Sequence, residues 1–260
     1  MYIHDGTTPL FMAALNGHTE VVKLLLDKNA NVNASCTDDG VTSLYAVALI
    51  GHTEMVKLLL DSNADVNTRC TNDSATPLYT AAEKGHTEVV KLLLENKANV
   101  NACCTDEDAT PLYIAAQKWL IEVVTLLLDH KADVNIKCRD NGPTPLYAAA
   151  QNGYSEVVKL LLDKNVDVNA SCTDDGVTPL HTAAHEGHTE VVKLLLEKNA
   201  DVNVGCAYDS GLTPLHLAAF NGYTEVVKLL LDNNADVTRC HTFASGCFQW
   251  THGSSETAGS

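Results

Sequence analysis

The chain has 260 residues, of which 45% are hydrophobic and 19% are charged, a composition typical of a folded protein rather than a disordered one. Its 33 acidic residues outnumber its 17 basic residues and leave a net charge of −16, which disfavours binding to nucleic acids or anionic membranes, because both require a basic surface. No apolar stretch is long enough to span a membrane, and no basic-then-apolar leader marks the N-terminus. We therefore expect an intracellular protein of the cytoplasm or nucleus.

A block of 34 residues repeats along the chain. Thr-Pro-Leu opens it at steps of 34 residues, the last step being 35, and Ser43 replaces the proline of the second copy. Glu-Val-Val-Lys-Leu-Leu-Leu follows in step, with variants at Glu54 and Glu122. Seven copies form one predicted domain over residues 2–237, with repeats near 2–33, 34–67, 68–101, 102–135, 136–169, 170–203 and 204–237.

Each copy predicts two helices and a loop. In the first copy, Thr8 suits the cap of a first helix, and Gly17 suits the left-handed position that ends it. Thr19 then suits the cap of a second helix, and the loop from Asn33 to Thr42 is polar and rich in turn residues. The second helix is too apolar to be buried by one helix pair, so neighbouring copies must stack on one another.

The fourth copy departs most from the pattern, because Trp119-Leu120 replaces the usual Gly-His or Gly-Tyr. A bulky residue is costly at positive φ, so we expect a remodelled turn. Ile121 replaces the capping Thr, and the two losses together predict faster hydrogen exchange over residues 110–128. The segment is either a drifted, repacked repeat or an exposed contact patch of Trp119, Leu120 and Ile121.

Residues 238–260 leave the repeat pattern and are predicted to form a C-terminal cap and tail. Phe243, Phe248 and Trp250 are candidates to cover the open face of the last repeat, and Gly253 to Ser260 has the composition of a flexible tail.

Seven of the nine cysteines form a column with a 34-residue step: Cys36, Cys70, Cys104, Cys138, Cys172, Cys206 and Cys240. Stacked helices lie about 8–10 Å apart, whereas a disulfide requires Cα atoms about 4.4–6.8 Å apart. We therefore expect all nine thiols to be free, no metal site in the column, and a reducing compartment.

The repeated motifs carry a family resemblance. Thr-Pro-Leu-His-x-Ala-Ala at Thr178 to Ala184 and at Thr213 to Ala219, Gly-His-Thr-Glu-Val-Val and Ala-Asp-Val-Asn resemble ankyrin repeats. The resemblance implies an all-α solenoid of stacked helix-turn-helix units with short β-hairpin fingers, and recognition through the fingers and inner helices. The His of Thr-Pro-Leu-His is kept only at His181 and His216, so the other copies lose any hydrogen bond that an imidazole would make there.

Two further columns have roles that the resemblance implies. The histidines before Thr-Glu should bond the backbone of a neighbouring repeat; they are His18, His52, His86 and His188. The asparagine of Val-Asn can be hydroxylated in the family, although a turn-stabilising role also explains it; it stands at Asn33, Asn67, Asn101, Asn135, Asn169 and Asn203.

Acidic residues gather in the predicted fingers, where only Arg69, Lys137 and Arg139 oppose them. Stacking would place these loops in one row with a negative potential, although such acids also make good turns and keep a protein soluble. The acids are Asp38, Asp39, Asp73, Asp106, Glu107, Asp108, Asp140, Asp174, Asp175 and Asp209.

The other candidate partner-binding residues are the two that follow Ala-Ala, which vary while the flanking columns repeat. They include Leu49, Ile50, Glu83, Lys84, Gln117, Lys118, Gln151, Asn152, His185, Glu186 and Phe220. In the first two copies Phe11, Leu15, Leu49 and Ile50 are candidate apolar anchors.

We expect a monomeric protein–protein interaction module that binds a protein partner, one with a basic segment, through its concave face and acidic fingers. A spacer within a larger protein, without a specific partner, is the alternative, and the close match of Ala34–Thr42 to Ala170–Thr178 favours it by suggesting repeat expansion. No nucleophile arrangement, phosphate loop or metal-binding motif is present, so we expect neither catalysis nor a cofactor.

Overall fold

The structure is a computed structural model that describes residues 7–35, 40–71, 74–104, 109–139, 142–172, 176–206 and 211–239. Within these ranges the chain forms fourteen helices and only isolated β-bridges. The helices are α1 (Pro9–Leu15), α2 (Thr19–Asp27), α3 (Ser43–Ile50), α4 (Thr53–Asp61), α5 (Pro77–Lys84), α6 (Thr87–Glu95), α7 (Pro111–Gln117), α8 (Ile121–Asp129), α9 (Pro145–Gln151), α10 (Ser155–Leu162), α11 (Pro179–Glu186), α12 (Thr189–Glu197), α13 (Pro214–Phe220) and α14 (Thr224–Asp232).

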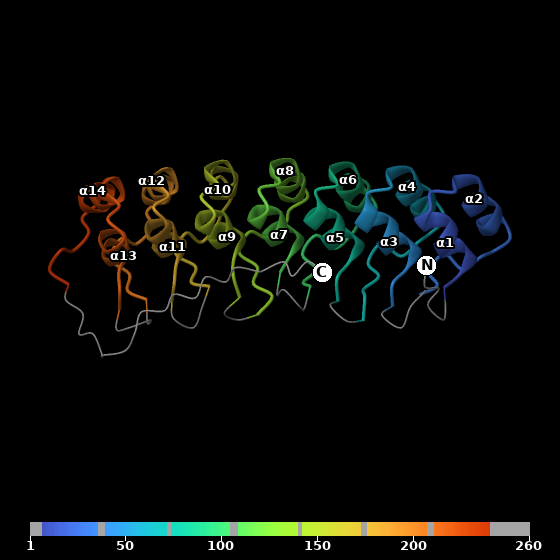
Figure 1. The fold of residues 1–260 in the computed structure, drawn as a ribbon, viewed down its shortest axis with the longest axis horizontal. Coiled ribbons are helices and arrows are strands. Elements are labelled where there is room, and N and C mark those ends of the chain that lie inside the picture. The colour runs from blue at the N-terminus through green and yellow to red at the C-terminus, as the bar shows by residue number, and fades with distance from the viewer. Residues whose placement is uncertain are drawn as a thin grey trace.

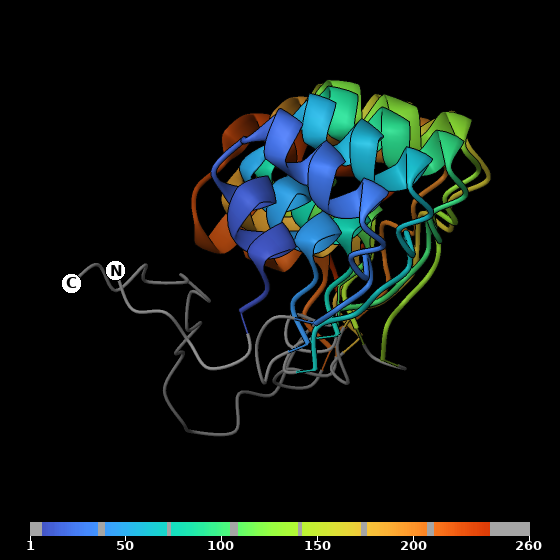
Figure 2. The ribbon, with the colours of Figure 1, turned by 90° about the vertical axis from the view of Figure 1, so that its right-hand side faces the viewer.

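The helices stack as pairs in chain order along the long axis of the molecule. Figure 1 shows the even-numbered helices in one row, the odd-numbered helices in a second row and the loops between repeats projecting beyond the second row. The view along the stack separates the same layers (Figure 2). We call the odd-numbered helices inner, the even-numbered helices outer and the projecting loops fingers. The predicted all-α solenoid of helix-turn-helix units is confirmed.

The inner helices begin as the sequence predicts. In the first copy the Thr8 hydroxyl accepts a hydrogen bond from the backbone N–H of Phe11 at 3.2 Å, and proline occupies the first helical turn. The second copy lacks the proline but keeps the same cap, from Thr42 to the N–H of Tyr45 at 3.3 Å. In the sixth copy the imidazole of His181 completes a capping box with Thr178.

The outer helices begin differently from the prediction. The position that precedes each described outer helix is held by His18 or its equivalents, with no capping hydrogen bond from the side chain, and Thr19 is already helical. The expectation that Thr19 is a cap was therefore wrong, and so was the expectation that Ile121 costs the fourth copy a cap. Thr19 and the equivalent threonines occupy the first helical position. Their hydroxyls accept no hydrogen bond from the unpaired backbone N–H groups of the first turn.

The α7–α8 turn keeps the geometry of the glycine turns, so the predicted remodelling was wrong. Trp119 adopts φ 58°, and its N–H reaches Ala116 O at 3.4 Å, as Gly17 reaches Ala14 O at 3.1 Å in the first copy. The left-handed conformation costs a non-glycine residue about 1–2 kcal/mol. The indole compensates part of this cost by stacking on Tyr154, with ring centroids 5.8 Å apart and planes 19° apart.

One continuous core runs through the stack. Most inner helices contribute an Ala-Ala pair, α3 contributes Val47-Ala48, and the outer helices contribute valines and leucines. Val56, Leu59, Val90 and Leu93 are thereby fully buried between neighbouring repeats. Full burial of such a side chain stabilises the fold by about 1.5–3 kcal/mol, and no pair of helices could bury them alone.

A ladder of asparagines joins each repeat to the next one. The side-chain oxygen of Asn135 accepts a hydrogen bond from the backbone N–H of Asp167 at 2.8 Å, and its amide donates to Asn165 O at 2.9 Å. The same acceptor bond recurs from Asn33, Asn67, Asn101, Asn169 and Asn203. The turn itself is held by the residue two positions earlier, as in the bond from Asn135 N to the carboxylate of Asp133 at 2.9 Å. The expected turn-stabilising role therefore belongs to that earlier residue.

Three of the described finger bases are closed as hairpins, as predicted. Antiparallel bridges pair Ser35 with Thr42, Cys104 with Ala109 and Cys206 with Leu212. The candidate C-terminal cap residues Phe243, Phe248 and Trp250 lie outside the described residues.

The expectation that all nine cysteines are free was wrong, because Cys103 and Cys138 form a disulfide. The helix spacing used for that expectation does not apply to the finger bases, which approach one another more closely and bring these two Cα atoms to 5.6 Å. Cys103 precedes the column, so the bridge does not join two column members. Cys70, Cys104, Cys172 and Cys206 are buried thiols outside the bridge.

Candidate partner-binding surface

The variable residues after Ala-Ala lie at the C-terminal ends of the inner helices. Because every helix pair repeats the same orientation, these ends form one row from α1 to α13 (Figure 1). The row is partly or fully solvent-exposed, and its largest exposed apolar side chains are Leu15 (36%), Ile50 (42%) and Phe220 (69%). The structure thus brings these predicted site residues onto one surface, with apolar side chains toward its two ends.

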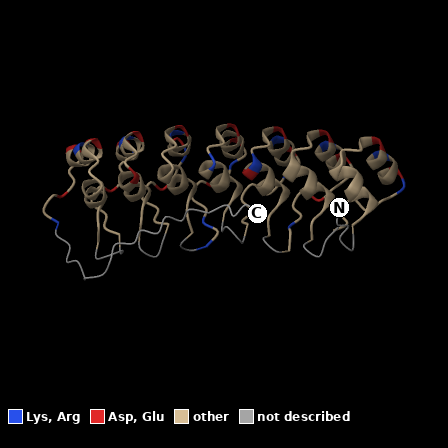
Figure 3. Ribbon diagram, in the orientation of Figure 1, with Lys and Arg blue, Asp and Glu red and all other residues tan. Residues whose placement is uncertain are grey.

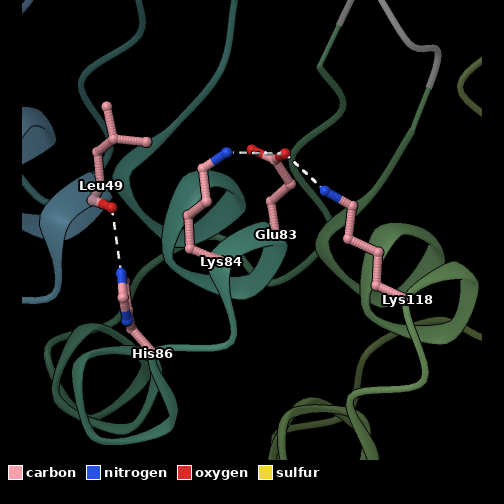
Figure 4. A network of polar contacts seen from close by, with 5 residues as sticks. All are labelled: Leu49, Glu83, Lys84, His86 and Lys118. Carbon is pink, nitrogen blue, oxygen red and sulfur yellow. Dashed lines mark hydrogen bonds and ion pairs between the residues drawn. The ribbon is translucent and has the colours of Figure 1, made fainter. Parts of the chain in front are cut away.

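The middle of this row is an ion-pair network. A carboxylate oxygen of Glu83 lies 3.2 Å from Nζ of Lys84 and 2.7 Å from Nζ of Lys118, which belongs to the next repeat (Figure 4). Burial raises the pKa of Glu83, but hydrogen bonds from Lys118 and Lys84 outweigh it and hold the pKa below its usual range. These residues therefore link α5 to α7 as well as facing solvent.

Polar contacts also order the C-terminal half of the row. Nδ1 of His185 lies 3.0 Å from a carboxylate oxygen of Glu186, and the amide of Asn221 donates to His185 O at 3.2 Å. Asn152 bonds within its own helix, to Ala148 O at 2.9 Å. The row thus presents carboxylates, amides and an imidazole in fixed positions.

Two histidines of the turn column, His86 and His188, have the structural role that the resemblance implied. Nε2 of His86 lies 3.1 Å from Leu49 O (Figure 4), and Nε2 of His188 lies 3.0 Å from Gln151 O, each contact reaching into the preceding repeat. The described residues contain no group of three or more His, Cys, Asp or Glu side chains that could hold a metal ion.

In the fifth copy, where Tyr147 replaces the histidine of Thr-Pro-Leu-His, the ring reaches the next repeat. Burial and then the neighbouring Cys172 raise the pKa of the Tyr147 hydroxyl, and the hydroxyl of Thr182 opposes this rise. Burial also raises the pKa of the Cys172 thiol to about 12. The thiol is therefore protonated at neutral pH and has a packing role rather than a reactive one.

The acidic finger residues all lie outside the described residues: Asp38, Asp39, Asp73, Asp106, Glu107, Asp108, Asp140, Asp174, Asp175 and Asp209. Two of the basic finger residues are described and engaged, because Arg69 donates to Cys103 O at 3.2 Å and Lys137 donates to Ser171 O. Figure 3 shows acidic and basic residues alternating on the outer helices. Two Glu–Lys pairs three residues apart on these helices, Glu20–Lys23 and Glu225–Lys228, are ion pairs of 2.7 Å.

Comparisons with known proteins agree with this architecture. Family models described as ankyrin repeats match residues 2–70, 68–138 and 146–240, and a further model of that description matches residues 121–162. No curated protein matches the chain. A crystal structure of the human ASB11 ankyrin repeat domain is 31% identical, covering 88% of this chain and 99% of that one with a TM-score of 0.72. Throughout the described ranges, every helix is too short or too polar to cross a membrane.

Proposed function

Because the chain belongs to the ankyrin-repeat family, we propose that it binds a protein partner through the row of inner-helix ends and the fingers beside it. Ankyrin repeats generally form protein–protein interaction modules and are typically non-catalytic. The observation that supports this site is the exposure of Ile50 and Phe220 on a row where Glu83 pairs with Lys118 and Asn221 bonds to His185 O. Preorganised polar groups beside exposed apolar anchors lower the entropic cost of binding.

The charge of the chain favours a partner with a basic segment. Ten acids stand in the finger sequences against three bases, and Arg69 and Lys137 are already bonded to neighbouring fingers. An extended loop or a helix that carries Lys or Arg would be attracted to this row while apolar side chains contact Ile50 and Leu49. In this proposal the module is a monomer inside the cell.

A spacer without a specific partner is the second candidate function. The repeated segment Ala34–Thr42 recurs without change at Ala170–Thr178, although a recognition loop that contacts different parts of a partner would be expected to vary. A spacer would retain no partner when immobilised and exposed to a cell lysate.

The test combines capture with charge neutralisation. Asp106, Glu107, Asp174 and Asp175 are replaced by Asn or Gln, and a matched control carries Gln at Glu20, Glu54, Glu190 and Glu225 of the outer helices, which removes the same charge. Association of the captured partner should slow, and its salt dependence should flatten, only in the finger variant. Equal rates and equal salt dependence in both variants would contradict recognition by the fingers.

A further inference from the structure

The α7–α8 turn carries an exposed aromatic pair that the other turns lack. Trp119 is 55% exposed and stacks on Tyr154, which precedes α10 of the next repeat. The other positive-φ positions before an outer helix hold glycine, at Gly17, Gly51, Gly85, Gly153, Gly187 and Gly222. Trp119 thus combines a strained backbone with a large exposed ring. The core does not require this residue, because glycine forms the same turn in the other six repeats.

Open hollows lie on both sides of the indole. One hollow of about 250 Å³ separates Trp119 from the preceding repeat and is lined by Gly85, Leu120 and Glu122. The other, of about 310 Å³, is lined by Trp119, Tyr154 and Glu156 of the following repeat. The indole is therefore a ridge with one carboxylate in the hollow on each side.

These two carboxylates lack the cation that the repeat pattern supplies. Every other column Glu is followed three residues later by Lys, but Glu122 is followed by Thr125, whose hydroxyl bonds Ile121 O at 2.9 Å. Lys159, the corresponding partner of Glu156, lies 3.7 Å from Glu190 of the next repeat instead. No described residue forms an ion pair with either Glu122 or Glu156.

We propose that this turn surface, formed by Trp119, Glu122, Tyr154 and Glu156, is a second docking site, which binds a basic peptide segment by its arginine side chains. A guanidinium is planar and weakly hydrated, stacks on aromatic faces and pairs with carboxylates, which matches an aromatic ridge between two uncompensated acids. Lysine would satisfy the charges but stack less well on the rings.

The geometry also sets the spacing of the ligand. The two hollows belong to successive repeats, and stacked helices lie about 8–10 Å apart. Three residues of a polyproline II segment span about 9 Å and bring the side chain back to the same face. The segment should therefore present Arg-x-x-Arg in a polyproline II conformation, with the intervening residues crossing the indole.

The site adjoins the row of inner-helix ends at Lys118, which directly precedes Trp119, but it is separate from the acidic fingers. The finger precedes α7 and the turn follows it, so the seven residues of that helix, about 10 Å, lie between them. Failure of the finger test would leave this inference standing, and the reverse also holds.

The test uses tryptophan fluorescence in the full chain. The chain has two tryptophans, so Trp250→Phe leaves Trp119 as the only reporter. The probes are acetyl-Arg-Leu-Leu-Arg-amide and the same peptide with citrulline at both ends, which keeps shape and hydrogen bonding but removes the charge. Saturable quenching by the arginine peptide, with binding at least about threefold weaker for the citrulline peptide, is expected.

Substitutions then locate the binding. Glu122→Gln should weaken binding of the arginine peptide about threefold, whereas Glu54→Gln, at the same repeat position two repeats earlier, should have no effect. Trp119→Gly restores the residue of the other turns, so the variant should fold, and calorimetry should show that it no longer binds the peptide.

Three results would overturn the proposal: no saturable quenching, equal binding of both peptides, or equal effects of Glu122→Gln and Glu54→Gln. A change of Trp119 fluorescence with protein concentration alone would also overturn it, since a second copy would then be the occupant.

Discussion

Replacing Asn135 by alanine should loosen the junction between the fourth and fifth repeats without disturbing either repeat. The side chain makes one bond to Asp167 N at 2.8 Å and one to Asn165 O at 2.9 Å, both in the next repeat. Within its own repeat, the bond from Asn135 N to Asp133 remains in the variant. The perturbation is thus confined to contacts between repeats.

The magnitude follows from those two bonds. A hydrogen bond contributes a net of about 0.5–1.5 kcal/mol, and both of these are solvent-exposed, so we expect a loss of about 1–2 kcal/mol in the free energy of unfolding. The loss acts at one interface of a nearest-neighbour stack, so the urea transition should also broaden.

The assay pairs urea unfolding with amide hydrogen exchange. The amide of Asp167 is the donor of the lost bond and should exchange faster, whereas the amide of Asp201, which bonds Asn169 one repeat further on, should not change. The matched control is Asn96→Ala, which removes a single bond to Leu92 O inside its own repeat and should cost less, about 0.5 kcal/mol.

The reasoning fails if Asn135→Ala costs no more than Asn96→Ala, or if the exchange of Asp167 and Asp201 changes equally. Either result would mean that buried apolar contacts alone hold successive repeats in register.

Two further predictions concern thiols and protons. Thiol titration of denatured protein prepared without reductant should count one thiol more in Cys103→Ser than in the wild type, because the substitution frees Cys138 from the bridge; a count that falls by one would contradict the disulfide. Burial lowers the pKa of His181 to about 4, so the unfolded state binds more protons between about pH 6.5 and 4. As the pH falls through that window, the free energy of unfolding should fall by about 3 kcal/mol. His181→Tyr introduces the residue of the fifth copy. In urea unfolding, this variant should be less destabilised relative to the wild type at about pH 4.5 than at pH 7. An unchanged pH dependence in the variant would assign the loss to other groups.

The repeat architecture could be predicted because its signals are local. A few adjacent residues are enough to predict that Thr-Pro starts a helix and that the valines and leucines of the next helix are buried. Thr8 caps α1 and Val56 is buried, as these patterns predict. The row of inner-helix ends was predictable for the same reason, since the variable positions follow a fixed motif.

Contacts between repeats were harder to predict, because they join residues more than 30 positions apart. The Cys103–Cys138 bridge depends on the close approach of two finger bases, which helix spacing does not report. The Trp119 turn was predicted wrongly because Tyr154, which supports the ring, belongs to the next repeat. The column of Cys and Tyr in step offered a signal that could have revealed the Tyr147–Cys172 contact.

The asparagine ladder affects how the number of repeats can change between related genes. Its bonds join residues 32 positions apart at five junctions and 33 at the last, where the extra residue falls in the finger. Loss of one 34-residue unit after Asn101 would place Asp167 32 positions beyond it, because 66 − 34 = 32, and the bond would form again. Unequal recombination between such similar gene segments can thus change the copy number of the units and still encode a chain whose junctions all close.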